Sequence, residues 1–153
     1  MNTGFVIYSL LMIGLAGGLR QSLRHYTHTR MVPLLFIIHS IGILLTALFR
    51  DDPMSVGNVM TPAGVLHNLS AITGCVALVL AMLVFAMAMY RNALWQGSVK
   101  FSVLTVAFIL VLVLLSQLET FDPVGGLLQR SFVVLSLAWI ELVSLKCLAL
   151  PVI

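Results

Sequence analysis

Five segments of this chain are long and apolar enough to cross a lipid bilayer as helices. They cover about residues 3–19, 33–49, 63–89, 101–118 and 131–150. A spanning helix needs roughly 20 mainly apolar residues, because the hydrocarbon core is about 30 Å thick and each helical residue rises about 1.5 Å. The connections between the segments are too short for a second folded unit. The sequence therefore predicts an all-α fold, a polytopic transmembrane helix bundle, with residues 1–153 as a single domain.

The composition supports a membrane protein and excludes several other classes. Charged residues make up 8% of the chain and hydrophobic residues 61%, whereas soluble domains carry roughly 25% and 45–50%. So few charges cannot cover a surface that faces water. A soluble enzyme, a nucleic-acid-binding protein and a disordered chain are excluded on this ground. The first basic residue, Arg20, follows the first apolar segment, so we expect that segment to be a retained helix rather than a cleaved signal peptide.

The basic residues predict how the chain crosses the membrane. Six of the eight Lys and Arg residues fall on one side of the predicted topology: Arg20, Arg24, Arg30, Arg91, Lys100 and Lys146. Loops rich in Lys and Arg face the cytoplasm. We therefore expect a multi-pass protein of the cell (inner) membrane, with its N-terminus outside and its C-terminus in the cytoplasm.

Two ionisable residues lie deep inside the predicted spans. His39 is ten residues before Phe49, and Glu141 is eleven residues after Arg130. Both therefore lie about 15–16 Å below the same face of the membrane. Ionisable groups at such a depth are costly and are candidates for function. We predict a polar pair of His39 and Glu141, either as a structural contact between helices or as a group that handles protons or substrate. The alternative is that the two residues make no contact with each other.

A second polar group is predicted at the outer face, where its members form a candidate ligand-binding site: Asp51, Asp52, His67, Gln129 and Arg130. Ser70 and Gly74 share the helix face of His67 by the three-and-four rule, and we expect this face to look inward. A hydrated pocket, a metal site, a hydrolytic centre and a purely structural set of turns and helix caps all stay open. No nucleophile motif or HExxH motif accompanies these residues.

The same observations lead us to expect no catalytic residue, no bound metal and no other cofactor. A haem held by two histidines is disfavoured, because His39 and His67 differ in depth by roughly 8 Å. In the first segment, Gly14 and Gly18 form a small-residue face that permits close packing of helices. The alternative is that glycine is simply common in membrane helices.

Short motifs cover nearly the whole chain. They are Phe49-x-Asp51-x-Pro53, then Thr61-Pro62-x-Gly64-x-Leu66-His67, then Gly126-Leu-Leu-Gln129-Arg130 followed by Trp139. In these motifs the chain resembles the bacterial and archaeal membrane proteins grouped as domain of unknown function 998. The resemblance implies a polytopic inner-membrane protein whose marked polar positions are Asp51, His67, Gln129 and Arg130. It implies no activity.

Two features depart from that family's usual pattern. Its members usually look six-helical, and this chain begins at what would be their second helix, so a five-helix variant and an absent upstream helix are both open. Arg50 stands where the family's proline is expected. This replacement puts the geometry of the turn in doubt.

Three functions fit the sequence. The first is a non-enzymatic membrane protein that serves as a small accessory subunit of a larger complex, with other membrane subunits or copies of itself as partners beside the lipid bilayer. The second is binding or transport of a small molecule or lipid through the outer polar pocket. The third and least favoured is a membrane-embedded enzyme acting on lipids, with His67 and Asp51 as acid–base partners. We favour the first function.

Overall fold

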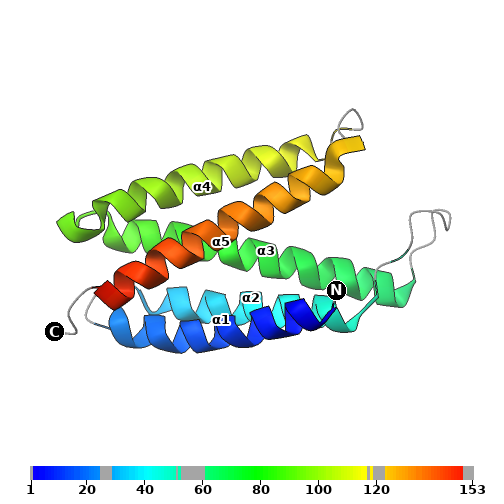
Figure 1. The fold of residues 1–153 in the computed structure, drawn as a ribbon, viewed down its shortest axis with the longest axis horizontal. Coiled ribbons are helices and arrows are strands. Elements are labelled where there is room, and N and C mark those ends of the chain that lie inside the picture. Colours follow the sequence, from blue (N-terminus) through cyan, green and yellow to red (C-terminus); the bar gives the residue numbers. More distant parts are fainter. Residues whose placement is uncertain are drawn as a thin grey trace. The chain divides into compact units, whose positions relative to one another are not determined.

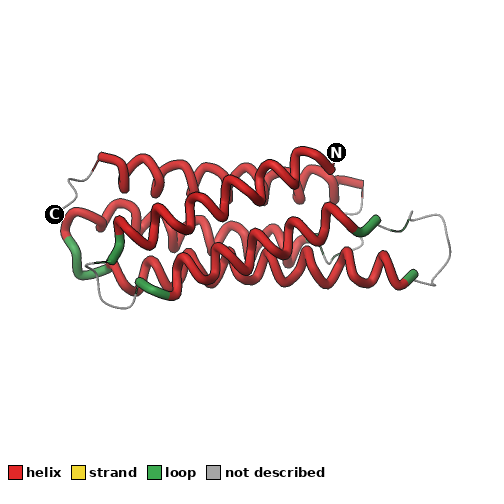
Figure 2. The backbone as a smooth tube through the Cα atoms, turned by 90° about the horizontal axis from the view of Figure 1, so that it is seen from below, coloured by secondary structure: helices red, strands yellow, loops and turns green. Residues whose placement is uncertain are grey.

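The computed structural model describes residues 2–24, 29–50, 52, 61–116, 118 and 123–149. In this part of the chain all regular structure is helical (Figures 1 and 2). The elements are α1 (Asn2–Ser22), α2 (Met31–Leu48), α3 (Pro62–Met89), the short 3-10 helix η1 (Ala93–Trp95), α4 (Gln96–Leu115) and α5 (Gly125–Ala149). All five α-helices are long and apolar enough to span a membrane. The predicted all-helical fold with five spans is therefore confirmed.

The helix ends differ from those of the apolar segments that predict them, and α2 and α4 end at Leu48 and Leu115 rather than near 49 and 118. α1 continues through Arg20 to Ser22, and α5 begins at Gly125 rather than near 131. A helix satisfies its own backbone hydrogen bonds, so it can continue through polar residues where the chain leaves the lipid. α4 begins at Gln96 rather than near 101 because it follows directly on η1. The N-cap residue of η1 is Asn92, whose side chain accepts a hydrogen bond from the Leu94 N–H.

The chain forms two compact units, Met1–Ala81 and Met82–Ile153, and each is described by itself. In the first unit α1 and α2 run antiparallel and lie side by side (Figure 1). The buried residues of α1 recur every three or four positions, as expected for one helix face. They are Ser9, Met12, Ala16 and Leu19, and Leu23 directly after the helix is buried as well.

α2 and the first part of α3 approach each other closely at a pair of glycines. A Cβ atom added to Gly42 would lie 2.8 Å from the Cα and N atoms of Gly74 and from the carbonyl oxygen of Ser70. Only residues without a side chain allow two helix backbones to come so near. Ser70 and Gly74 are buried, as expected for the inward face of this helix.

An aromatic cluster forms the core of the second unit. Phe85, Trp95 and Trp139 are almost completely buried. The Phe85 ring makes T-shaped contacts with both indoles, at centroid distances of 5.3 Å to Trp95 and 5.7 Å to Trp139. The Trp139 Nε1–H donates a 2.7 Å hydrogen bond to the Ser102 hydroxyl, which itself donates to the Ser98 carbonyl. This cluster joins α3, η1, α4 and α5 within the unit.

Candidate functional site

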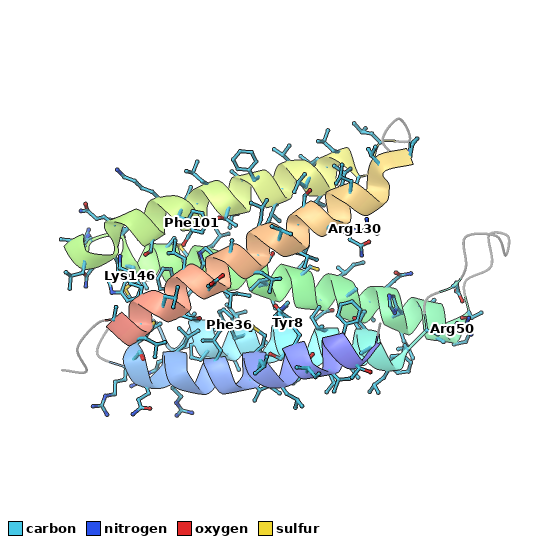
Figure 3. The ribbon with its side chains drawn as sticks, in the orientation of Figure 1. Tyr8, Phe36, Arg50, Phe101, Arg130 and Lys146 are labelled. Carbon is cyan, nitrogen blue, oxygen red and sulfur yellow. The ribbon has the colours of Figure 1, made fainter. Side chains whose placement is uncertain are left out.

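His39 connects all three helices of the first unit. Its Nδ1 atom lies 2.8 Å from the Gly74 carbonyl oxygen on α3, and its Nε2 atom lies 2.8 Å from the Tyr8 hydroxyl on α1. The Tyr8 and His39 rings also meet edge to face, with centroids 5.6 Å apart. His39 is 3% exposed, so both bonds lie away from solvent. Figure 3 labels Tyr8 on α1.

These two bonds fit a neutral His39 ring. A carbonyl oxygen only accepts hydrogen bonds, so Nδ1 carries the proton and donates to Gly74. The unprotonated Nε2 then accepts the bond that the Tyr8 hydroxyl donates. A protonated ring would instead donate at both nitrogens, and the Tyr8 proton would need another acceptor. The neutral ring thus has both nitrogens engaged, and it acts as a structural link between helices.

The close approach of α2 and α3 makes the bond from His39 to Gly74 feasible. A Cβ atom added to Gly74 would lie 3.3 Å from the His39 carbonyl oxygen and 3.4 Å from the Cδ1 atom of Ile43. A larger residue would therefore push α3 away from α2 and lengthen the bond. We call the histidine, its tyrosine partner and the two glycines the His39 junction. Its residues are Tyr8, His39, Gly42 and Gly74.

The predicted partner of His39, Glu141, lies in the other unit. It is exposed on α5. Since the two residues belong to separate units, the pair of His39 and Glu141 stays a prediction. The bonds that the structure gives to His39 come from Tyr8 and Gly74, neither of which the sequence singles out as its partner.

Asp52 caps the start of α3. Its carboxylate accepts hydrogen bonds from the Thr61 backbone N–H at 2.8 Å and from the Thr61 hydroxyl at 2.6 Å. The Thr61 hydroxyl oxygen in turn accepts a bond from the Gly64 N–H at 3.1 Å. A negative charge is favourable at a helix N-terminus because the first N–H groups lack partners within the helix. The carboxylate lies directly over Gly64, where any side chain would collide with it.

His67, near the start of α3, binds the C-terminal end of α2. Its Nδ1–H donates a 2.9 Å hydrogen bond to the carbonyl oxygen of Phe49, the residue that caps the C-terminus of α2. The last carbonyl groups of a helix have no intrahelical partner, so the histidine satisfies one of them. His67 is half-buried. It therefore has a clear structural partner of its own.

The remaining residues of the predicted outer pocket belong to the second unit or lie outside the described residues. Gln129 and Arg130 are exposed near the start of α5, in the second unit (Figure 3). Asp51 lies outside the described residues. A ligand site made of Asp51, Asp52, His67, Gln129 and Arg130 stays a prediction. Among the described residues, no group of three or more His, Cys, Asp and Glu side chains could hold a metal ion.

The sequence motifs did mark several residues with a structural role. Phe49, Thr61, Gly64 and His67 all belong to the two motifs around the α2–α3 connection, and each takes part in the cap or the His67 bond. Tyr8 and Gly42 carried no comparable signal. Their importance depends on which helices pack together and at what rotation, and a single apolar segment does not reveal either.

Comparison with known proteins yields one finding. Residues 1–146 match the model of a family described as a protein of unknown function, DUF998. No curated protein and no solved structure matches the chain. The match covers all five helices up to the last residues of α5.

Proposed function

Because this chain belongs to the DUF998 family, whose description assigns no activity, we propose from its own geometry that it is a non-enzymatic accessory subunit of a membrane complex. In this role it binds a transmembrane helix of another membrane protein through α1. The contact surface is the small-residue face of α1 formed by Gly14 and Gly18.

The bonds of the polar residues in the first unit support a role without catalysis. Both ring nitrogens of His39, the Nδ1 atom of His67 and both carboxylate oxygens of Asp52 are engaged by residues of the same chain. A general acid or base must reach the reacting atom directly or through one water. Groups that already hold helices together would have to release those partners first.

One observation carries the proposed association, namely the open face of α1. A Cβ atom added to Gly14 or Gly18 would meet no described atom within 4 Å. Gly42 differs from these two glycines, because it lies in a close contact between two helices of this chain. The buried stripe of α1 lies on another face of the helix. Gly14 and Gly18 thus leave room for the backbone of a further helix.

Native mass spectrometry of the protein, extracted mildly from its own membrane, tests this proposal. We expect a complex of this chain with another membrane protein at a fixed stoichiometry. In the variant G14L/G18L we expect the fraction of complex to fall at least tenfold, which corresponds to about 1.4 kcal/mol, because leucines keep the partner helix at a distance.

The matched control is G97L/G126L, since both of these glycines are also exposed and open. It adds the same two side chains to other helices and should leave the complex intact. Masses that contain copies of this chain alone would contradict the proposed role as an accessory subunit. Equal loss of the complex in both variants would contradict the assignment of the surface to α1.

A further inference from the structure

A cavity of about 700 Å³ lies between the end of α1 and the start of α2. This volume is within the usual range of small-molecule sites, roughly 300–1,000 Å³. Its lining includes three arginines and one glutamine: Arg20, Gln21, Arg24 and Arg30. Gly17 and Pro33 also line it. The cavity belongs entirely to the first unit and is separate from the His39 junction and the Asp52 cap.

The charged residues that line this cavity are all positively charged. Its lining contains no acidic residue, and the first fifty residues of the chain contain no Asp or Glu. The acids of the first unit, Asp51 and Asp52, follow the other end of α2, an 18-residue helix that is about 27 Å long. Guanidinium groups present planar pairs of N–H donors that match the oxygens of a phosphate. The cavity is therefore suited to a phosphate anion.

The position of the cavity along the helices indicates which kind of phosphate it binds. The candidate spans run from Thr3 to Ser22 and from Met31 to Leu48. The cavity thus lies where these two spans end, at the depth of the lipid headgroups. The arginines that line it also predict that this end faces the cytoplasm. Basic pockets between transmembrane helices on this side bind the headgroups of anionic lipids.

The face of α1 that leads to the cavity favours a lipid over a free phosphate. Leu10, Ile13, Gly17 and Arg20 follow one another at spacings of three and four and so share one helix face. Leu10 and Ile13 are 60% and 42% exposed, and a Cβ atom added to Gly17 would meet no described atom within 4 Å. This face is apolar toward the middle of the helix and basic at its end. It thus matches an anionic phospholipid, which has apolar acyl chains and a negatively charged headgroup.

From the arginine-lined cavity and this helix face we infer that the first unit binds an anionic phospholipid, with its phosphodiester held by Arg20, Arg24 and Arg30. An acyl chain of the same lipid lies along Leu10 and Ile13. This lipid site does not depend on the proposed partner helix, because it uses other residues of α1.

Native mass spectrometry of the full chain in detergent, with added phosphatidylglycerol or phosphatidylcholine, tests the lipid site. We expect phosphatidylglycerol to bind at least tenfold more tightly than phosphatidylcholine. The variant R20Q/R30Q should bind phosphatidylglycerol roughly 30-fold more weakly, since each basic residue near an anionic headgroup contributes about 1 kcal/mol. The control variant R91Q/K100Q removes the same charge from the second unit, at the α3–α4 connection and in the first turns of α4, and should change the affinity less than threefold.

A second pair of variants tests whether the lipid needs the open space of the cavity, in addition to the charge of its arginines. G17L should weaken phosphatidylglycerol binding at least tenfold because its side chain fills the cavity, whereas G126L should not. Circular dichroism checks that each variant keeps its helices. Equal binding of the two lipids, or an equal effect of R20Q/R30Q and R91Q/K100Q, would overturn the site. Inorganic phosphate that competes at equal concentration with phosphatidylglycerol would show a free phosphate as the ligand and would also overturn it.

Discussion

The two units of this protein hold their helices together in different ways. In the first unit a histidine joins three helices through hydrogen bonds, one of them to a backbone carbonyl at a glycine crossing. In the second unit two tryptophans and a phenylalanine fill the core, with one indole N–H bonded to a serine. Lipid tails are as apolar as leucine, so helices in a membrane associate through packing and polar bonds rather than through the hydrophobic effect. We therefore expect the stability of the first unit to fall when side-chain atoms are added at the glycine crossing. The stability of the second unit should fall when side-chain volume is removed from the aromatic cluster.

The largest expected effect is the loss of volume from the aromatic cluster. Trp139→Ala should lower the free energy of unfolding by about 3–5 kcal/mol, because it removes a fully buried indole, its ring contact with Phe85 and its hydrogen bond to Ser102. Titration with sodium dodecyl sulfate in mixed micelles, followed by circular dichroism, measures this change.

Phe108→Ala is the matched control for Trp139→Ala. It also removes an aromatic ring, but Phe108 is 59% exposed on α4. We expect a change below about 0.5 kcal/mol, as for other surface substitutions. Similar losses in the two variants would show that burial in this cluster does not decide the stability of the second unit.

The next effect concerns added volume at the glycine crossing of the first unit. Gly42→Ala should lower the free energy of unfolding by about 1–3 kcal/mol, because its methyl group would meet backbone atoms that cannot rotate away. Gly74→Ala should cost less, because its nearest contacts are longer and one is a flexible side-chain atom. The same micelle titration compares the two variants.

Gly126→Ala serves as the reference for this pair, since a Cβ atom there meets no described atom. It should be neutral or stabilising by up to about 1 kcal/mol, the difference in helix propensity between the two residues. From the most to the least stable variant, the expected order is therefore Gly126→Ala, Gly74→Ala and Gly42→Ala. A reversed order of the last two would contradict the described packing of α2 on α3.

The fold was predictable to a large extent because lipid imposes a simple rule. A chain that crosses the hydrocarbon must form a helix of about 20 apolar residues, so segment lengths alone predicted five helices. The helix ends were less predictable. α5 begins at Gly125, ahead of Gln129 and Arg130, because helical hydrogen bonding continues where the side chains become polar.

The site was predictable only in part. The depth of His39 marked it as a residue of interest, yet its partners Tyr8 and Gly74 depend on the rotation and pairing of three helices. The small-residue motif drew attention to Gly14 and Gly18, whereas the close contact within the chain uses one glycine from each of two helices. A pair of single glycines on separate helices leaves no pattern in a linear sequence.

The smallest effect concerns a single hydroxyl in the His39 junction. Tyr8→Phe keeps the ring that packs against His39 and removes only the hydrogen bond to Nε2. Hydrogen bonds between membrane helices average about 0.6 kcal/mol and reach about 1.7 kcal/mol, so we expect a loss within that range. Tyr90→Phe is the control, because the Tyr90 side chain is exposed and its hydroxyl bonds only to the adjacent Arg91 among the described residues.

Nitrogen NMR of the His39 ring adds a readout that a general loss of stability would not produce. In the native protein the Nδ1 atom should carry the proton and the Nε2 atom should show the shift of an acceptor that receives a hydrogen bond. Tyr8→Phe should change the Nε2 signal and leave Nδ1 bonded to the Gly74 carbonyl. An unchanged Nε2 signal would mean that Tyr8 is not the partner, and α1 would then be held in the first unit by packing alone. A changed signal would show that a hydrogen bond from Tyr8 links α1 to His39 in addition to the edge-to-face contact of the two rings.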